Sequence, residues 1–250
     1  MDREANVSGI LSQTVDVLSA AGRSVLIYIL LLGLFSGIGG LFGLATMDDN
    51  FFSVGWSGGL VDTETAGLLE VLFNLAGLAL FVIASYFLLQ QMMATIGRPM
   101  QGRSRFWSFV GMSILAAIGT MIGFVLLVIP GIIVMVRWSA ANGYVLNGEH
   151  SVTESLGASW EATDGHGLSI FGAGLVLWLS LAVLTGIVSG VIGGLGLAAS
   201  SGGVLSPMLA IAVAVSGFLE ALTNAASFAF SIAVFHLVAP ASTAVADVFE

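Results

Sequence analysis

Long apolar segments, separated by short polar ones, dominate the pattern of this 250-residue chain. Six of them are candidate membrane-crossing helices, because about 20 apolar residues span the roughly 30 Å of a bilayer's hydrocarbon core. The six cover residues 25–45, 68–94, 107–129, 131–146, 168–198 and 207–238. The pattern predicts an all-α fold, a polytopic transmembrane helical bundle of about six spans. The fourth segment would rise only ~24 Å as a helix, so five spans is the alternative.

Residues 7–18 (VSGILSQTVDVL) have the pattern of a short amphipathic helix. Leu11, Val15 and Leu18 recur at helical spacing on one face, and Ser8 is placed to cap the start. We expect this helix to lie on the membrane surface before the first span. The chain then divides into an N-terminal amphipathic segment (1–24), a single transmembrane helical domain (25–238) and a short C-terminal tail (239–250).

A second amphipathic helix is predicted over residues 151–164. Its first four residues, Ser-Val-Thr-Glu, form a capping box, in which the serine and glutamate side chains each accept a hydrogen bond from the other's backbone amide. Val152, Leu156 and Trp160 follow at four-residue spacing, and Gly165 is placed to end the helix. Because tryptophan prefers the headgroup level, this helix is also expected to lie on the membrane.

Composition agrees with an integral membrane protein. Hydrophobic residues make up 57% of the chain and charged residues only 8%, and the mean hydropathy is +1.04. A water-soluble domain of this size would need more charge to cover its surface. Basic residues are few and do not cluster enough to suggest a nucleic-acid partner. Membrane lipids are the expected partners.

The sequence offers no motif for catalysis or for metal binding. It contains no Cys, which excludes disulfides, thiolate metal sites and cysteine nucleophiles. Its three His are scattered, and it contains no Walker loop, dinucleotide fingerprint, zincin helix or nucleophile elbow. We expect no enzyme activity, no metal site and no cofactor.

The placement of arginine predicts the orientation. Arg23 precedes the first span, and Arg98, Arg103 and Arg105 lie between the second and third. The segment between the first two spans carries four acidic residues and no Arg. By the positive-inside rule the N-terminus and the Arg-rich loop are cytoplasmic, and six spans would return the C-terminus to the same side.

Pro130 and Gly131 interrupt a long apolar run in the sequence VLLVIPGIIVMVRW. Proline removes a helical amide and clashes with the preceding turn, whereas glycine permits angles closed to other residues. We expect a tight turn here, on the outer side, between two antiparallel helices. The alternative, a single kinked span, would need a helix of ~40 residues, too long for one bilayer.

Arg137 follows this turn by six residues, which is ~9 Å along a regular helix. A guanidinium inside a membrane is normally paired or faces a watery cavity. Glu220 in the last span is the predicted partner, with Asn142 and Asn224 completing a polar cluster. Two interpretations stay open: a gated ion pair in a solute or lipid path, or a polar contact that holds helices together.

Small residues recur at four-residue spacing in several spans and suggest close helix packing. The longest stripes are Gly186, Gly190 and Gly194 in the fifth span, and Gly217, Ala221, Ala225, Ala229 and Ala233 in the sixth. Such stripes let helix backbones approach where no hydrophobic effect drives association. They indicate packing within the chain or, as the alternative, contact with another membrane protein or a second copy.

Residues 127–172 resemble the signature region of the bacterial glycerophosphoryl diester phosphodiesterase membrane-domain family. The resemblance is carried by a Leu-Val-Ile-Pro-Gly turn, an apolar stretch with one Arg, and a few later positions: Pro130, Gly131, Arg137, Glu149, Ser159, Trp160 and Gly165. It implies a membrane module of the bacterial inner membrane. Relatives named for the phosphodiesterase carry a soluble catalytic barrel after this module, and residues 239–250 leave no room for one, so we expect no phosphodiesterase activity.

The sequence therefore supports two functional hypotheses. The first is a non-enzymatic integral inner-membrane protein that serves as a structural or assembly module of the envelope. The second is a transporter or lipid-handling protein that uses Arg137 and Glu220 at the helix hairpin.

Overall fold

The protein is entirely helical over the part of the chain that the structure describes. This computed structural model describes residues 4–42, 44, 67–100, 105–148, 150–199 and 207–239. These residues form nine α-helices and no strand, which confirms the predicted all-α class. The helices are α1 (Val7–Ala20), α2 (Gly22–Leu41), α3 (Leu68–Thr95), α4 (Phe106–Leu126), α5 (Val128–Arg137), α6 (Ala141–Asn147), α7 (Val152–Ala162), α8 (Gly167–Ala199) and α9 (Pro207–Val238).

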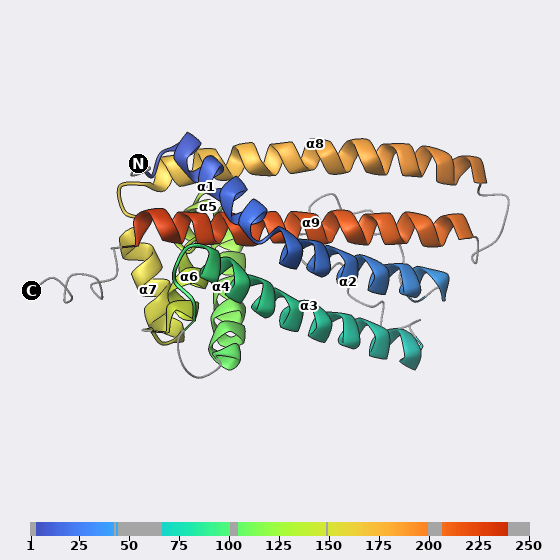
Figure 1. The fold of residues 1–250 in the computed structure, drawn as a ribbon, viewed down its shortest axis with the longest axis horizontal. Coiled ribbons are helices and arrows are strands. Elements are labelled where there is room, and N and C mark those ends of the chain that lie inside the picture. Colours follow the sequence, from blue (N-terminus) through green and yellow to red (C-terminus); the bar gives the residue numbers. More distant parts are fainter. Residues whose placement is uncertain are drawn as a thin grey trace, which may run out of the picture.

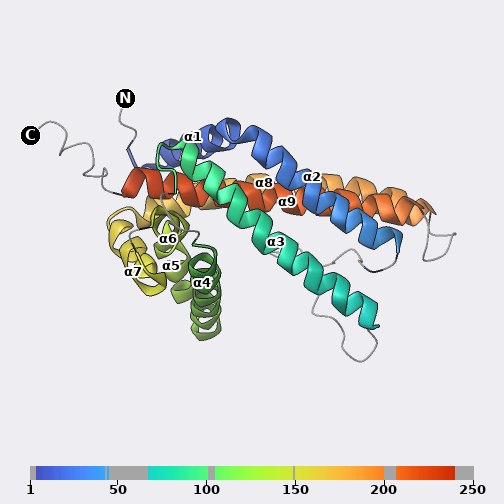
Figure 2. The same ribbon diagram turned by 60° about the horizontal axis from the view of Figure 1, so that its bottom comes forward.

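Six helical segments of the described chain are long and apolar enough to cross a membrane. They agree with the six predicted segments, and the fourth consists of α5 and α6 with a short turn between them. In Figure 1, α2, α3, α8 and α9 run lengthwise, whereas α4 runs across them. Figure 2 shows the same relation after rotation about the long axis. The bundle therefore has four long helices, of which α8 and α9 lie side by side and α2 and α3 are inclined to them in Figure 2, and a crosswise helical part near one end.

Helix α9 is the packing centre of the bundle, with contacts to α1, α2, α3, α6 and α8. Its predicted small-residue stripe faces the interior, since Ala221, Ala225, Ala229 and Ala233 are at most 1% exposed. On α2, a Cβ built on Gly33 would lie 2.0 Å from the Phe218 ring, so the two helices are in close contact there. This stripe serves packing within the chain.

The predicted stripe on α8 has a different environment. A Cβ built on Gly186 or Gly190 would meet no other atom within 4 Å, and the buried positions Ile170 and Ala173 lie near the start of the helix, away from these glycines. The side chain of position 194 lies outside the described residues. Contact of this stripe with another protein or a second copy stays a prediction.

Helix α1 has a different N-cap from the predicted one and buries a different set of positions. Asn6, not Ser8, is the N-cap, and its side chain accepts a hydrogen bond from the amide of Gly9 at 2.8 Å. The buried positions are Ile10, Thr14 and Val17 rather than Leu11, Val15 and Leu18, and Val15 is 62% exposed. Apolar residues occupy two neighbouring faces of this helix, and contact with α8 and α9 selects between them.

Helix α7 follows its prediction closely. The capping box is present: Glu154 accepts a hydrogen bond from the Ser151 amide at 2.8 Å, and the Ser151 hydroxyl accepts one from the Glu154 amide at 3.5 Å. Leu156 is 6% exposed and packs inward, whereas Trp160 is 41% exposed. Gly165 has a φ of 76°, a left-handed conformation that glycine adopts without strain, and it ends this helical stretch.

Helices α4 and α5 form the predicted antiparallel hairpin, but its turn is at Leu127. That residue is extended (φ −168°, ψ 152°), and α5 begins at the next residue. Pro130 therefore lies in the first turn of α5, where its missing amide costs no helical hydrogen bond. Gly131 packs directly on α4, since a Cβ on Gly123 would lie 3.0 Å from the Gly131 Cα. The Pro-Gly pair thus permits close packing beside the turn instead of making the turn.

We predict that Gly143→Ala lowers the melting temperature in detergent, because the new Cβ would lie 2.0 Å from Cγ of the buried Phe235. Overpacking of this kind costs about 1–3 kcal/mol. The matched control is Gly186→Ala, where the new Cβ has no neighbour within 4 Å. It should be neutral or slightly stabilising, since alanine favours helices. Equal melting temperatures for the two variants would contradict the prediction.

Candidate functional site

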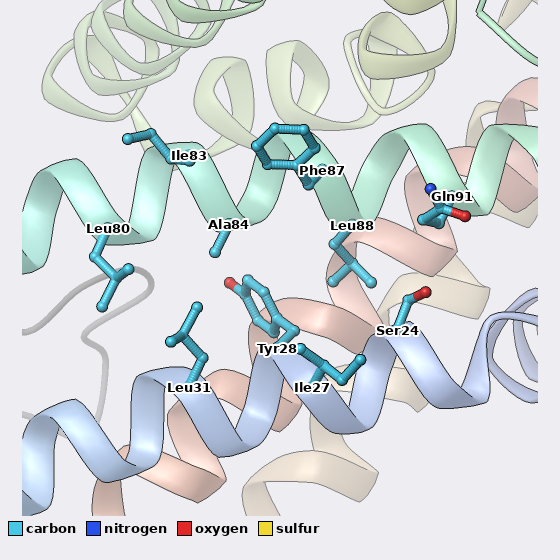
Figure 3. Close-up of a pocket in the computed structure, with 10 residues that line it drawn as sticks. All are labelled: Ser24, Ile27, Tyr28, Leu31, Leu80, Ile83, Ala84, Phe87, Leu88 and Gln91. Atoms are coloured by element: carbon cyan, nitrogen blue, oxygen red, sulfur yellow. The ribbon is translucent and has the colours of Figure 1, made fainter.

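A lateral groove of about 280 Å³ lies between α2 and α3. This volume approaches the roughly 300–1,000 Å³ of typical ligand pockets. Figure 3 shows Leu80, Ala84 and Leu88 of α3 pointing towards α2, where Tyr28 and Leu31 point towards α3, whereas Ile83 and Phe87 lie on the other side of α3. Its lining consists of Ser24, Ile27, Tyr28, Leu31, Leu80, Ile83, Ala84, Phe87, Leu88 and Gln91. None of these residues is charged.

The floor of the groove is closely packed and its rims are open. Tyr28 is 3% exposed, its hydroxyl lies 3.2 Å from the Ser85 hydroxyl, and its ring packs edge-on against Phe228 of α9. By contrast, Ile27 and Phe87 on the rims are 56% and 58% exposed. The groove is therefore a preformed apolar surface that opens sideways, towards the lipid if α2 and α3 cross the membrane.

The polar residues of the lining lie at one end. Figure 3 places Ser24 of α2 and Gln91 of α3 near each other, at the start of one helix and the end of the other. The lining contains no pair of a nucleophile and a base, and its remaining length is hydrocarbon or aromatic. Such an arrangement can hold an apolar chain with a polar end.

The structure corrects the predicted partner of Arg137. The Nη2 atom of Arg137 lies 2.8 Å from Oδ1 of Asp164, and its guanidinium lies 5.6 Å from the centre of the Trp160 ring. The side chains of Arg137 and Asp164 retain 23% and 79% exposure, so the pair is at the edge of the protein. Glu220, the predicted partner, lies near the middle of α9.

Helix geometry explains why Arg137 and Glu220 are apart. Two residues after Arg137, the carbonyl of Ser139 accepts a hydrogen bond from the Ser231 hydroxyl at 2.6 Å. Ser231 lies eleven residues beyond Glu220 in α9, which is ~16 Å along the helix axis. An arginine side chain cannot bridge that distance. The break between α5 and α6 places Arg137 at the same end of the molecule as α7.

The other residues of the predicted cluster, Asn142, Asn224 and Glu220, lie in two different places. Asn142 donates to the Ser231 hydroxyl at 3.1 Å, which ties α6 to α9. Asn224 and Glu220 line a small crevice of about 10 Å³ with Ser36 of α2. A space of this size holds at most one water molecule. The four residues Arg137, Glu220, Asn142 and Asn224 therefore do not form one polar site.

Three of the family-signature positions lie around Arg137. The Ser159 hydroxyl donates to the Arg137 carbonyl at 2.7 Å and accepts from the Ala140 amide at 3.2 Å. Trp160 contributes its ring and its carbonyl, and Gly165 follows the ion-paired Asp164. We call this set the α5–α7 junction. Its hydrogen bonds satisfy backbone groups at the break after α5, so it has a structural role. Glu149 lies outside the described residues.

The sequence did not single out Asp164 or the groove. Asp164 is 27 residues from Arg137, and only the turn after α7 brings the two together. The groove residues are ordinary apolar residues of two spans, distinguished only by the way α2 and α3 diverge. No group of three or more His, Asp or Glu that could hold a metal occurs among the described residues.

We predict that Ser159→Ala destabilises the protein by about 1–3 kcal/mol, because it removes the hydroxyl that accepts from the Ala140 amide and leaves the Arg137 carbonyl with the longer 3.3 Å bond from Thr163. Ser155→Ala is the matched control. Ser155 lies one turn earlier, is also 0% exposed, and bonds only to the Ser151 carbonyl of its own helix. Thermal unfolding in detergent should show a larger loss for Ser159→Ala, and similar losses would contradict this role.

A pH dependence is expected for the ion pair. The hydrogen bond from Arg137, together with its charge and the Gly165 amide, lowers the pKa of Asp164 below its usual 3.8. The pair therefore stabilises the fold at neutral pH, and this contribution is lost as the pH falls through the lowered pKa. Because Asp164 is exposed, the effect is small.

The measurement is the melting temperature of the wild type and of Asp164→Asn between pH 7 and pH 3. The wild type should be the more stable at pH 7, and the difference should shrink towards the acid end of the range. Glu154 also has a pKa lowered by its hydrogen bonds to Ser151, but it titrates equally in both proteins. A difference that does not change with pH would show that the charge of Asp164 is irrelevant.

Comparison with protein-family models, with curated proteins and with solved structures finds no match to this chain. The resemblance to the glycerophosphoryl diester phosphodiesterase membrane-domain family therefore stays a prediction from residues 127–172. What is established is a membrane-type helical bundle with a lateral apolar groove and a structural junction at Arg137.

Proposed function

We propose that this chain is a non-enzymatic, multi-pass membrane protein that holds an acyl chain of a membrane lipid in the groove between α2 and α3. The observation that carries the proposal is the groove itself. It is uncharged, apolar along its length, fixed at its floor by Tyr28, and open along exposed rims.

The distribution of polar groups favours a lipid over a water-soluble ligand. A soluble ligand would need several convergent polar partners, but the Tyr28 hydroxyl is already next to Ser85. Ser24 and Gln91, at one end of the groove, suit the polar end of a lipid. Arg23 precedes Ser24 and is exposed, so its charge is available to the phosphate of a headgroup. An acyl chain needs only dispersion contacts with the rest.

The same geometry argues against transport through an intramembrane ion pair. That hypothesis needs Arg137 beside Glu220, and the two have different surroundings in this bundle. The crevice at Glu220 is also too small for a solute. Of the functions expected from the sequence, lipid handling is favoured by the groove, without the predicted charged gate.

A role in assembly is compatible with lipid binding and has its own support. Helix α8 carries no charged residue and exposes Gly186 and Gly190 on a face that touches nothing in the described chain. In a bilayer, such a face suits close packing with a helix of another membrane protein. We infer that the protein is a module of the bacterial inner membrane, with the end that carries Arg23, Arg98 and Arg105 in the cytoplasm.

We predict that a photo-crosslinking amino acid at Ile27 captures a co-purified lipid after extensive detergent exchange. Leu26 is the matched control, because the two side chains are 56% and 57% exposed but only Ile27 lines the groove. Leu31 and Leu30, at 43% and 44% exposure, form a second pair of the same kind. Intact-mass analysis should find the lipid adduct at the groove positions in excess over their neighbours. Equal adducts within both pairs would overturn the proposal.

A blocking variant tests the groove more directly. Ala84→Phe places a ring inside the groove and should reduce the adduct formed from Ile27 several-fold. Ala79→Phe, on an exposed part of α3 outside the groove, should leave it unchanged. A blocked groove with an undiminished adduct would mean that the lipid is bound elsewhere.

A further inference from the structure

The hairpin formed by α4 and α5 is apolar and largely unpartnered. Residues 106–136 contain no charged side chain. Its distal part is the most exposed apolar region there, since six side chains are between 62% and 76% exposed: Met121, Val125, Leu126, Leu127, Val128 and Ile129. A surface of this kind is stable in hydrocarbon and would be a liability in water.

The base of the hairpin is anchored to one end of the bundle. The first turns of α4 are packed, with Phe109 and Met112 at 5% and 2% exposure. The guanidinium of Arg105 donates to the carbonyls of Gly148 and His150, between α6 and α7. At the end of the second helix of the hairpin, the turn after α5 is tied to α9, because the Ser231 hydroxyl donates to the Ser139 carbonyl. The start of α4 and the end of α5 therefore lie at the same end of the molecule.

Helix α4 of the hairpin does not lie alongside the long helices, although α5 contacts α8. Helix α4 packs on α5, α6 and α7 and touches α3, but it has no extended contact with α2, α8 or α9 in the described chain. Figures 1 and 2 both show α4 running across the direction of α8 and α9, and in Figure 2 the hairpin projects away from them. If those long helices cross the bilayer, the hairpin runs along it.

Helix lengths give the level at which the hairpin leaves the bundle. Helices α8 and α9 have 33 and 32 residues, ~48–50 Å, whereas the hydrocarbon core is only about 30 Å thick. Each end therefore extends ~10 Å past the hydrocarbon if the helices are centred. Ser231 is seven residues, ~10 Å, from the end of α9 at Val238. The hairpin is thus attached near the boundary between headgroups and hydrocarbon.

Two backbone amides at the turn of the hairpin are satisfied within the hairpin itself. Unpaired backbone amides are costly in lipid. The Leu127 amide donates to the Gly123 carbonyl at 3.1 Å, and the Gly131 amide donates to the Leu127 carbonyl at 3.3 Å. Pro130 has no amide to satisfy. Trp107, at the start of α4, is 80% exposed, and tryptophan is enriched at the membrane interface.

We propose that the α4–α5 hairpin is embedded in a single leaflet, on the side of Arg98 and Arg105, with its exposed tip in contact with the acyl chains of that leaflet. Four helices, α2, α3, α8 and α9, then cross the bilayer completely. The hairpin is a docking surface for lipids of one leaflet, and it turns back before it reaches the opposite surface. This inference is independent of the lipid in the α2–α3 groove.

Single cysteines test the proposal, because the chain has none of its own. Val128→Cys marks the tip, Gly67→Cys marks the far side at the start of α3, and Glu161→Cys marks the near side on α7. A membrane-impermeant maleimide is applied to intact cells and to vesicles of both orientations. It should label Gly67→Cys from one side of the membrane and Glu161→Cys from the other. It should not label Val128→Cys from either side. Labelling of Val128→Cys together with Gly67→Cys would mean a full crossing and would overturn the proposal.

Spin labels measure the depth of the tip. Leu26, Leu30, Leu34 and Ile38 are exposed on α2 at one-turn intervals of ~6 Å and form an internal depth scale. A nitroxide at Val128 should be accessible to oxygen and poorly accessible to a nickel chelate, at a depth matching positions 26–30. A depth at or beyond position 38 would overturn the proposal. So would shielding from both reagents, which would mean that a protein covers the tip, or free access to nickel, which would mean that water does.

Discussion

Close approach of helix backbones to α9 is the constraint on which the bundle depends. In a bilayer, apolar helix surfaces gain nothing from leaving the lipid, so association relies on short-range contact between well-fitted surfaces. The four alanines from Ala221 to Ala233 leave α9 narrow along one face, and they are almost completely buried. Glycines on the neighbouring helices complete the fit. Gly33 accommodates the ring of Phe218, and Gly143 that of Phe235.

Polar groups in this protein mainly support that packing. Ser231 binds both Asn142 and the Ser139 carbonyl, so a single hydroxyl of α9 holds the turn between α5 and α6. Ser159 satisfies two further backbone groups at the same break, and Arg137 is neutralised beside it by Asp164. A guanidinium that first suggests transport chemistry thus contributes to the connection between a broken helix and α7. The site that lacks a structural explanation is the groove between α2 and α3.

The groove and the hairpin have a common physical feature. Both present exposed apolar side chains that no other part of the described chain covers, and both are close to the end of the bundle that carries Arg23, Arg98 and Arg105. Lipid is the neighbour that such surfaces require. The two proposals therefore give membrane lipids a specific role, as a bound chain in one case and as the medium of one leaflet in the other.

Local chemistry was readable from the sequence alone. Apolar runs of membrane length predicted the six candidate spans, because helix rise and bilayer thickness are fixed quantities. The capping box at Ser151 and Glu154 and the left-handed Gly165 were also predictable, since each depends on neighbours within a few residues. The hairpin followed from Pro130 and Gly131, although helix packing moved its turn to Leu127.

Contacts between distant segments were decided only by the tertiary structure. The partner of Arg137 depends on the break after α5, which turns the chain towards Asp164 and leaves Glu220 about 16 Å away along α9. The buried face of α1 depends on where α8 and α9 lie, because that helix has two apolar faces. The groove depends on the divergence of α2 and α3, and the direction of α4 on its anchoring at one end. None of these has a local sequence signal, because each is a property of how rods pack in three dimensions.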